Sequence, residues 1–157
     1  MEAVRLVGVT KGWAGVKAVS NLSLSMEKGE FITLLGPSGC GKTTTLRMIA
    51  GLEDPDAGDI YIDDGLVFSA SKGINVPPPQ RGLGMIFQSY ALWPHMTVFD
   101  NVAFGLVQQK VPKDQIRSRV MGCLEQVELA PLAQRFPSEL SGGQQQRVAV
   151  ARMVVVS

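Results

Sequence analysis

The pattern of apolar and polar positions predicts strands in the first part of the chain. Residues 4–9 alternate between apolar and polar side chains, and Leu22, Leu24 and Met26 recur at every second position. A period of two places such side chains on one face of a strand, so both segments are predicted to be half-buried strands. Residues 60–62 predict a short strand, and the Asp-Gly pair at 64–65 predicts a hairpin turn after it.

Two other segments are apolar with little alternation. Residues 31–35 (FITLL) and 83–87 (LGMIF) are short, rich in strand-forming residues and bounded by turn residues. A continuous apolar run is typical of a strand that is buried on both faces, as in a parallel sheet. Both segments are therefore predicted to be central strands.

Helices are predicted between and after these strands. Gly51 stands where a helix that starts at Lys42 would stop, and Thr97 with Asp100 has the spacing of a capping box. The predicted helices are 42–50, from Thr97 to about 109, 114–127 and 143–155. Residues 72–80 contain three consecutive prolines and are predicted to be irregular. Alternating strands and helices, with a helical insert near the middle, define an α/β chain.

Composition narrows the class of protein. The chain has 157 residues, which is the size of one domain, and 45% of them are hydrophobic against 18% charged, so disorder is not expected. Lys plus Arg is 15 and Asp plus Glu is 14, which gives no electrostatic case for a nucleic-acid partner. The sequence predicts neither a signal peptide nor a membrane span. Cys40 and Cys123 are predicted to be reduced thiols without metal spacing.

A glycine-rich loop carries the strongest chemical signal. Residues 36–43, Gly-Pro-Ser-Gly-Cys-Gly-Lys-Thr, match G-x-x-x-x-G-K-[ST] at every fixed position, between a predicted strand and a predicted helix. Glycines let backbone N–H groups surround a phosphate, and the following helix directs its positive end at the same anion. Lys42 would contact the β- and γ-phosphates, and Thr43 would offer its hydroxyl to Mg²⁺. The competing interpretation is an ordinary glycine-rich turn. Under both interpretations, Cys40 is expected to be chemically silent.

A second motif opens the last predicted helix. Residues 140–144 read Leu-Ser-Gly-Gly-Gln, followed by Gln-Gln-Arg. Taken alone, Ser-Gly-Gly before a helix is equally well explained as a capped helix start. Together with the upstream phosphate loop, it resembles the signature motif of the ATP-binding-cassette (ABC) ATPases.

Further positions support the resemblance. Gln88 falls where the family has its Q-loop glutamine, residues 89–98 resemble the same stretch in maltose, spermidine and ferric-type importer ATPases, and Trp13 stands where the family has an aromatic residue that stacks on adenine. The alternative for Trp13 is a residue packed at a strand end. The resemblance implies catalytic roles for Lys42, Gln88 and Ser141, and metal binding by Thr43 and Gln88. It implies ATP contacts from Trp13, Gly36, Pro37, Ser38, Gly39, Cys40, Gly41, Lys42, Thr43, Thr44, Gln88, Ser141, Gly142, Gly143 and Gln144.

The resemblance also implies a fold and partners. The expected fold is a P-loop NTPase (RecA-like) core with an N-terminal antiparallel β subdomain and a helical subdomain at about 88–143, within one ATP-binding domain that residues 1–157 fill in part. The expected partners are a second copy or a related ATPase subunit, bound head to tail, and transmembrane permease subunits. The expected place is the cytoplasmic side of the plasma (inner) membrane, as a peripheral subunit that energises solute import.

The family pattern beyond the signature helix is not present in this sequence. The family next has a strand ending in a metal-binding Asp, a catalytic Glu and a switch His. Asp63 and Asp64 are instead predicted to form a turn, and His95 to be an exposed or docking residue. The chain is therefore expected to have an incomplete sheet and to be inactive alone. Two other interpretations stay open: a non-catalytic remnant that binds nucleotide or a partner only, and a soluble ABC ATPase of translation or DNA repair.

Overall fold

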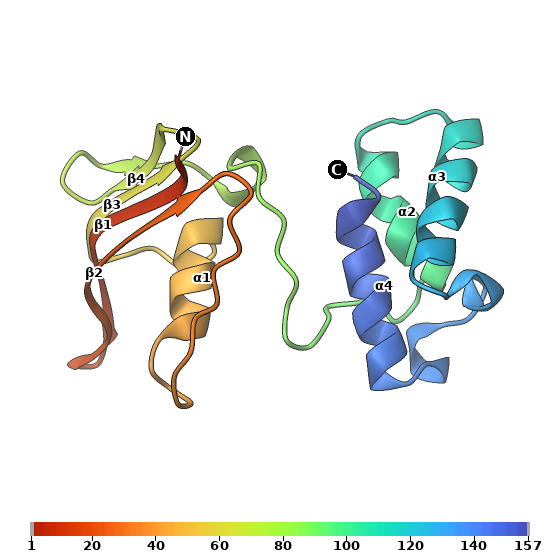
Figure 1. The fold of residues 1–157 in the computed structure, drawn as a ribbon, viewed down its shortest axis with the longest axis horizontal. Coiled ribbons are helices and arrows are strands. Elements are labelled where there is room, and N and C mark those ends of the chain that lie inside the picture. Colours follow the sequence, from red (N-terminus) through yellow and green to blue (C-terminus); the bar gives the residue numbers. More distant parts are fainter. Residues whose placement is uncertain (1, 157) are drawn as a thin grey trace. The chain divides into compact units, whose positions relative to one another are not determined.

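The computed structural model describes residues 2–156, which form two compact units (Figure 1). The first lies within Met1–Leu83 and the second within Gly84–Ser157. The first unit contains an antiparallel sheet and one helix, whereas the second is helical. Each unit has its own hydrophobic core.

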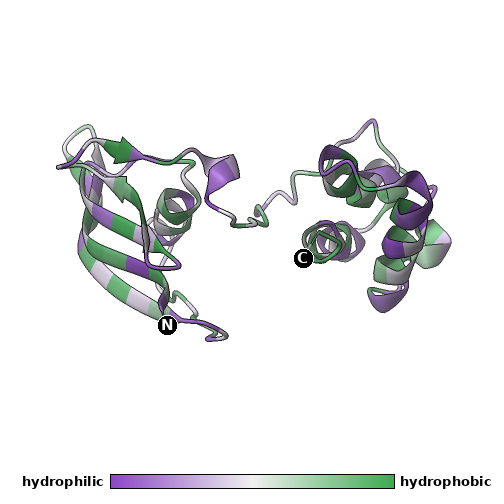
Figure 2. Ribbon diagram, turned by 90° about the horizontal axis from the view of Figure 1, so that it is seen from above, coloured by the Kyte–Doolittle hydropathy of each residue, from purple (hydrophilic) through white to green (hydrophobic). Residues whose placement is uncertain are grey.

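The first unit is built on a five-stranded open sheet with the strand order β2-β1-β3-β4-β5. The strands are β1 (Glu2–Trp13), β2 (Val16–Glu27), β3 (Ala57–Ile62), β4 (Gly65–Ser69) and β5 (Ile74–Asn75). All neighbouring pairs are antiparallel. The strands predicted at 4–9, 22–26 and 60–62 are confirmed, each as part of a longer strand. Hydrophobic and hydrophilic residues alternate visibly along them (Figure 2).

One helix packs on this sheet. Helix α1 (Lys42–Ala50) places Met48, which is fully buried, against strand residues that include Val9, Val19 and Ile60. The predicted bounds of 42–50 are confirmed. The core of the unit is therefore shared between the alternating faces of the strands and a single helix, and α1 begins at the glycine-rich loop.

The hairpin between β3 and β4 turns one residue earlier than Asp64-Gly65. Ile62 pairs with Gly65, so Asp63 and Asp64 form the two-residue loop, with φ angles of 46° and 64°. A two-residue hairpin whose strands follow the natural twist needs positive φ at both loop positions. Aspartate tolerates this conformation better than most residues, so Gly65 is left as the first residue of β4.

The end of α1 is held by a buried arginine. Gly51 follows the helix with φ of 78°, as predicted for a helix stop. Arg81 is 4% exposed, and its guanidinium donates to the carbonyl oxygens of Met48 (2.8 Å), Ile49 (3.0 Å) and Val76 (2.8 Å). Burial lowers the pKa of Arg81. Carbonyl oxygens at the end of the helix thus receive a charged donor.

The two central strands predicted at 31–35 and 83–87 are not formed. Both segments are irregular, and Phe31 and Leu35 are 92% and 89% exposed, while Leu83 and Ile86 are also exposed. A strand is stabilised by main-chain hydrogen bonds to a neighbouring strand. Within residues 2–156, neither segment pairs with such a neighbour, so the apolar sequence does not become a parallel sheet.

The second unit is a helical bundle. It consists of α2 (Val98–Gln108), α3 (Lys113–Gln126) and α4 (Gly142–Val154), with short 3-10 turns at Ala130–Leu132 and Pro137–Glu139. A further 3-10 turn in the first unit, Pro78–Gln80, occupies the proline-rich segment. Apolar residues of all three long helices form one core, among them Val102, Leu106, Val120, Leu124 and Val148, all fully buried. The three predicted helices are confirmed to within about two residues.

Candidate functional site

The glycine-rich loop precedes α1 in an exposed position. Gly36, Gly39 and Gly41 have φ angles of 155°, 83° and 90°, in the region that favours glycine. Gly41 is the N-cap of α1 and, within the described chain, no side chain caps this helix. The first N–H groups of α1 therefore have no side-chain acceptor among the described residues, and the positive end of the helix dipole faces the loop. This is the arrangement that binds anions.

Lys42 bends back over the loop. Its Nζ donates to the carbonyl oxygens of Gly36 and Pro37, both at 2.7 Å, and lies 3.5 Å from the sulfur of Cys40. These contacts close residues 36–42 into a ring through the Lys42 side chain. A triphosphate that entered this ring would meet a positive charge and backbone N–H groups together.

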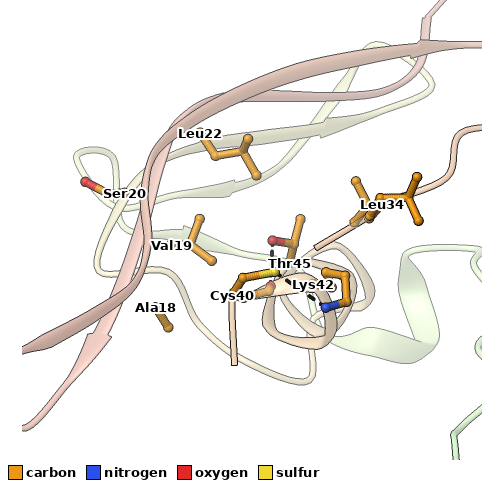
Figure 3. A pocket seen from close by; sticks show the side chains of 10 residues that line it. Ala18, Val19, Ser20, Leu22, Leu34, Cys40, Lys42 and Thr45 are labelled. Atoms are coloured by element: carbon orange, nitrogen blue, oxygen red, sulfur yellow. Dashed lines mark hydrogen bonds between the residues drawn. The ribbon is translucent and has the colours of Figure 1, made fainter. Parts of the chain in front are cut away.

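An open cavity of about 260 Å³ lies beside the loop (Figure 3). Cys40 of the loop and Lys42 and Thr45 of α1 face it, with Val19 and Leu22 of β2 on one side and Leu34 on the other. The remaining lining residues are Ala18, Ser20, Leu35 and Gly41. The cavity combines an apolar wall with one cation, as small-molecule sites commonly do.

Strand β2 packs directly on the loop. A Cβ atom on Gly41 would collide with the carbonyl oxygen of Ala18 and lie 2.9 Å from Val19 Cγ2. Gly41 is buried, so the glycine is required by close approach as well as by its φ angle. This contact fixes the loop against the strand that follows Trp13.

The three threonines at the start of α1 differ in their surroundings. Thr43 is exposed and Thr44 is half-buried, whereas Thr45 is buried and its hydroxyl donates to the carbonyl oxygen of Gly41 at 3.0 Å. Thr45 is a structural residue that the sequence analysis did not single out. Thr43 is the exposed threonine of the three, and a hydroxyl oxygen is a ligand that suits Mg²⁺.

Trp13 is the last residue of β1 and is 48% exposed. It pairs with Val16, two residues before Ala18, so it lies roughly 7 Å along β2 from the point where this strand meets the loop. Lys11 Nζ lies 5.4 Å from the centre of the indole ring, within cation–π distance. About half of the residue is exposed, so Trp13 is not a core residue.

Lys11 is itself held in place by acidic residues. Its ammonium group contacts Glu53 at 3.0 Å and Asp56 at 3.3 Å, and Asp56 also accepts the N–H of Gly12 at 2.8 Å. The Glu53 contact, with Asp56, raises the pKa of Lys11, and the Gly12 N–H, with Lys11, lowers the pKa of Asp56. The network ties the end of β1 to the segment that follows α1.

Gln88 lies in the second unit. It is exposed, in a turn that the N–H of Tyr90 closes on the carbonyl oxygen of Phe87 at 2.9 Å. The segment after it is anchored by Asn101, which is fully buried. The Asn101 side chain accepts from Trp93 N and donates to Trp93 O, with lengths of 2.9 and 3.1 Å. The sequence analysis missed Asn101, although a polar residue beside the buried Val98 and Val102 on an apolar helix was a signal.

The Ser-Gly-Gly-Gln motif forms a reciprocal helix cap. The Ser141 hydroxyl accepts the N–H of Gln144 at 3.3 Å, and the Gln144 side chain accepts the N–H of Ser141 at 2.8 Å. The interpretation as a capped helix start is therefore correct for this chain. Gly142 and Gly143 are exposed, and a Cβ on either would meet nothing within 4 Å. Their backbone is open to a ligand or partner.

The predicted site residues are thus divided between the units. Trp13, the loop residues 36–42, Thr43 and Thr44 belong to the first, and Gln88 with residues 141–144 belongs to the second. Among residues 2–156, no cluster of three or more His, Cys, Asp or Glu side chains could hold a metal ion. A cation at Thr43 would therefore share the oxygens of a bound phosphate.

A glycine-rich loop closed by its own lysine, at the uncapped start of a helix, defines the class of P-loop nucleotide-binding proteins. A family model described as ABC transporter matches residues 19–157. The chain belongs to the ABC transporter family. None of the helices among residues 2–156 is long and apolar enough to cross a membrane.

Nearly the whole chain is similar in sequence to part of known import ATP-binding proteins. The trehalose/maltose import ATP-binding protein MalK of Thermococcus litoralis is 58% identical over 155 residues, which are 99% of this chain and 42% of that protein. The spermidine/putrescine import ATP-binding protein PotA of Vibrio cholerae is 57% identical over 97% of this chain and 39% of its own length. The chain therefore spans about two-fifths of the length of these relatives.

Solved structures share the fold. The bacterial ABC transporter cassette MJ0796, solved as a dimer, matches with a TM-score of 0.85 and 33% identity, covering 98% of this chain and 69% of that one. Its post-hydrolysis state, bound to ADP and Pi, matches equally well. The fold class is that of the ABC cassettes, with an open antiparallel sheet and a helical unit.

Proposed function

We propose that the chain is part of an ATP-binding subunit that energises solute import by an ABC transporter. The observation that carries this proposal is the loop at residues 36–42, over which Lys42 Nζ folds back at the uncapped start of α1. The importer names of MalK and PotA support the coupling to transport.

ATP and Mg²⁺ have separate positions in this proposal. The β- and γ-phosphates lie in the loop from Gly36 to Thr44, the adenine ring stacks on Trp13, and Mg²⁺ binds the Thr43 hydroxyl with Gln88. Two observations support it: Trp13 is about half exposed and precedes the strand that contacts Gly41, and Thr43 is exposed at the start of α1. Mg²⁺ would neutralise phosphate charge as the terminal phosphoryl group is transferred to water.

A second ATPase subunit completes the site in this proposal. Ser141, Gly142, Gly143 and Gln144 act on the γ-phosphate held by the partner, in a head-to-tail dimer. The exposed backbone of Gly142 and Gly143 supports a contact from outside the chain, and the dimeric cassette MJ0796 supports this assembly. Residues 88–143 would serve as the helical subdomain of a single ATP-binding domain that docks on transmembrane permease subunits through residues 89–98, at the cytoplasmic face of the plasma membrane.

Replacement of Lys42 tests the proposal. We expect Lys42→Ala to weaken ATP binding at least about tenfold, because hydrogen bonds to charged groups contribute about 1.5–3 kcal/mol. Titration of labelled ATP into each variant measures the affinity. Lys72→Ala is the matched control, since Lys72 is exposed in a turn of the same unit. Equal affinities for wild type, Lys42→Ala and Lys72→Ala would remove the loop from the nucleotide site.

A further inference from the structure

Arg152, in the last turn of α4, reaches back to the segment that follows Gln88. Its Nη1 donates to the carbonyl oxygen of Ala91 at 2.8 Å, and its Nη2 donates to that of Tyr90 at 3.2 Å. The guanidinium carbon lies 4.9 Å from the centre of the Trp93 ring. Arginine offers both a donor fork and a flat cationic face, and this contact uses both.

The carbonyls that Arg152 holds belong to a strained part of the backbone. Tyr90 and Ala91 are consecutive non-glycine residues with φ angles of 62° and 47°. Such a conformation is unfavourable for residues with a Cβ, and it persists only where the surroundings hold it. The fork of Arg152 binds both residues at once and therefore supplies such a restraint.

Neighbouring contacts fix the same segment on both sides. On the far side, Asn101 binds the backbone of Trp93, whose ring packs on Phe104 with the ring centres 4.2 Å apart. On the near side, a Cβ on Gly84 would collide with Met153, the neighbour of Arg152 on α4. The last turn of α4 thus contacts both ends of residues 84–91, and the strained pair is the end that Arg152 binds.

We propose that Arg152 is a positioning residue that locks residues 88–93 to the end of the signature helix α4. Helix α4 runs from Gly142 to Val154, so roughly 16 Å of helix separates the Ser141 cap from Arg152. A movement of the cap is therefore delivered as a movement of the segment that carries Gln88. The consequence for transport rests on the proposed function, whereas the locking of the segment does not.

The chain provides a matched control on the same helix. Arg147 also donates to a backbone carbonyl, that of Val127 at 3.0 Å, and it contacts Glu128 at 3.4 Å. It therefore has the same residue type and the same kind of bond as Arg152, but it acts on the end of α3. A general loss of stability would affect both regions, whereas loss of the lock would affect one.

Hydrogen exchange of the full chain tests the lock. In Arg152→Gln we expect the Tyr90 amide, which is bonded to Phe87 O, to exchange at least about tenfold faster than in wild type. In Arg147→Gln we expect that amide to be unchanged and the Val127–Leu129 region to exchange faster. Arg152→Lys should be intermediate, because an ammonium keeps the charge over Trp93 but lacks the fork.

Two results would overturn the proposal. One is an unchanged Tyr90 amide in Arg152→Gln; the other is an equal acceleration in both arginine variants. If Arg152→Gln does not fold, which loss of protection throughout α3 would reveal, the difference between Arg152→Lys and Arg147→Gln decides. ATP titration of wild type tests the proposed function separately. Failure of wild type to bind ATP would refute the proposed function and leave the exchange result standing.

Discussion

At the scale of the residue, Trp13 combines an exposed ring with a fixed position. The Lys11 ammonium contacts the ring and is anchored by Glu53 and Asp56. An ammonium group near an indole leaves the ring otherwise free to stack, and the anchor reduces the entropy that stacking would cost. Because the side chain is half exposed, its removal should leave the fold intact.

We therefore expect Trp13→Ala to weaken binding of ATP and GTP by similar factors. Base stacking on an aromatic side chain contributes about 1–3 kcal/mol and depends little on which base is stacked. Trp13→Tyr, which retains an aromatic face, should bind nearly as wild type does. Fluorescence titration with labelled ATP and GTP measures both affinities. Wild-type affinity in Trp13→Ala would make the residue a bare surface position.

At the scale of the element, α2 is stabilised by two polar residues of different kinds. Thr97 caps its start, where the hydroxyl accepts the N–H of Asp100 at 3.1 Å. Asn101, one turn later, is buried and binds the backbone of Trp93, Met96 and Thr97. The cap is exposed to solvent, whereas the amide is enclosed by the core.

We expect Asn101→Ala to lower the free energy of unfolding more than Thr97→Ala does. Loss of an N-cap costs about 1 kcal/mol, because water replaces the side chain. Loss of the buried amide leaves buried groups unpaired, at about 1–3 kcal/mol for each. Urea unfolding followed by circular dichroism measures both changes. A smaller effect for Asn101→Ala than for Thr97→Ala would mean that water enters and satisfies the freed groups.

Elements with local determinants were predicted from the sequence. The stop signal of α1, Gly51, directly follows that helix, and the start signal of α2, Thr97, directly precedes it. The phosphate loop is likewise a single contiguous segment of the sequence. The strands predicted at 31–35 and 83–87 were wrong for this chain, because a central strand depends on a neighbour that its own sequence does not encode.

Arg81, Asn101 and Arg152 were missed for a related reason. Their main partners are backbone carbonyl oxygens, which every residue carries. A long-range bond between two side chains can be recognised in the sequence as a pair of complementary charges. A bond to a backbone carbonyl leaves no such pattern in the sequence. The functional assignments of Gln88 and of residues 89–98 likewise came from resemblance rather than from spacing.

At the scale of the whole molecule, binding and hydrolysis make different demands. The ten residues that line the cavity beside the loop include Lys42 but no acidic residue. Phosphoryl transfer to water needs groups that orient the water and hold the metal. We expect residues 1–157 alone to bind ATP and to release phosphate no faster than Lys42→Ala does.

A phosphate-release assay measures this rate. A mixture of equal amounts of the wild-type chain and the Lys42→Ala chain serves as the control for assembly. In a head-to-tail pair of the two, the intact loop of one chain would face the intact signature cap of the other. Steady hydrolysis that Lys42→Ala abolishes would show that the catalytic groups lie within residues 1–157.

The contact between Gly51 and Arg81 makes the two positions interdependent. A Cβ on Gly51 would lie 2.6 Å from Arg81 Nε, so any side chain at 51 displaces the guanidinium from the end of α1. Part of the harm from such a substitution is therefore already present once Arg81 has been lost. In a pairwise mutational scan the two changes should show positive epistasis: the double variant retains more stability than the sum of the single losses allows. A relative without the glycine thus has less need to keep the arginine thirty positions away, and substitutions at the two positions are expected to occur together.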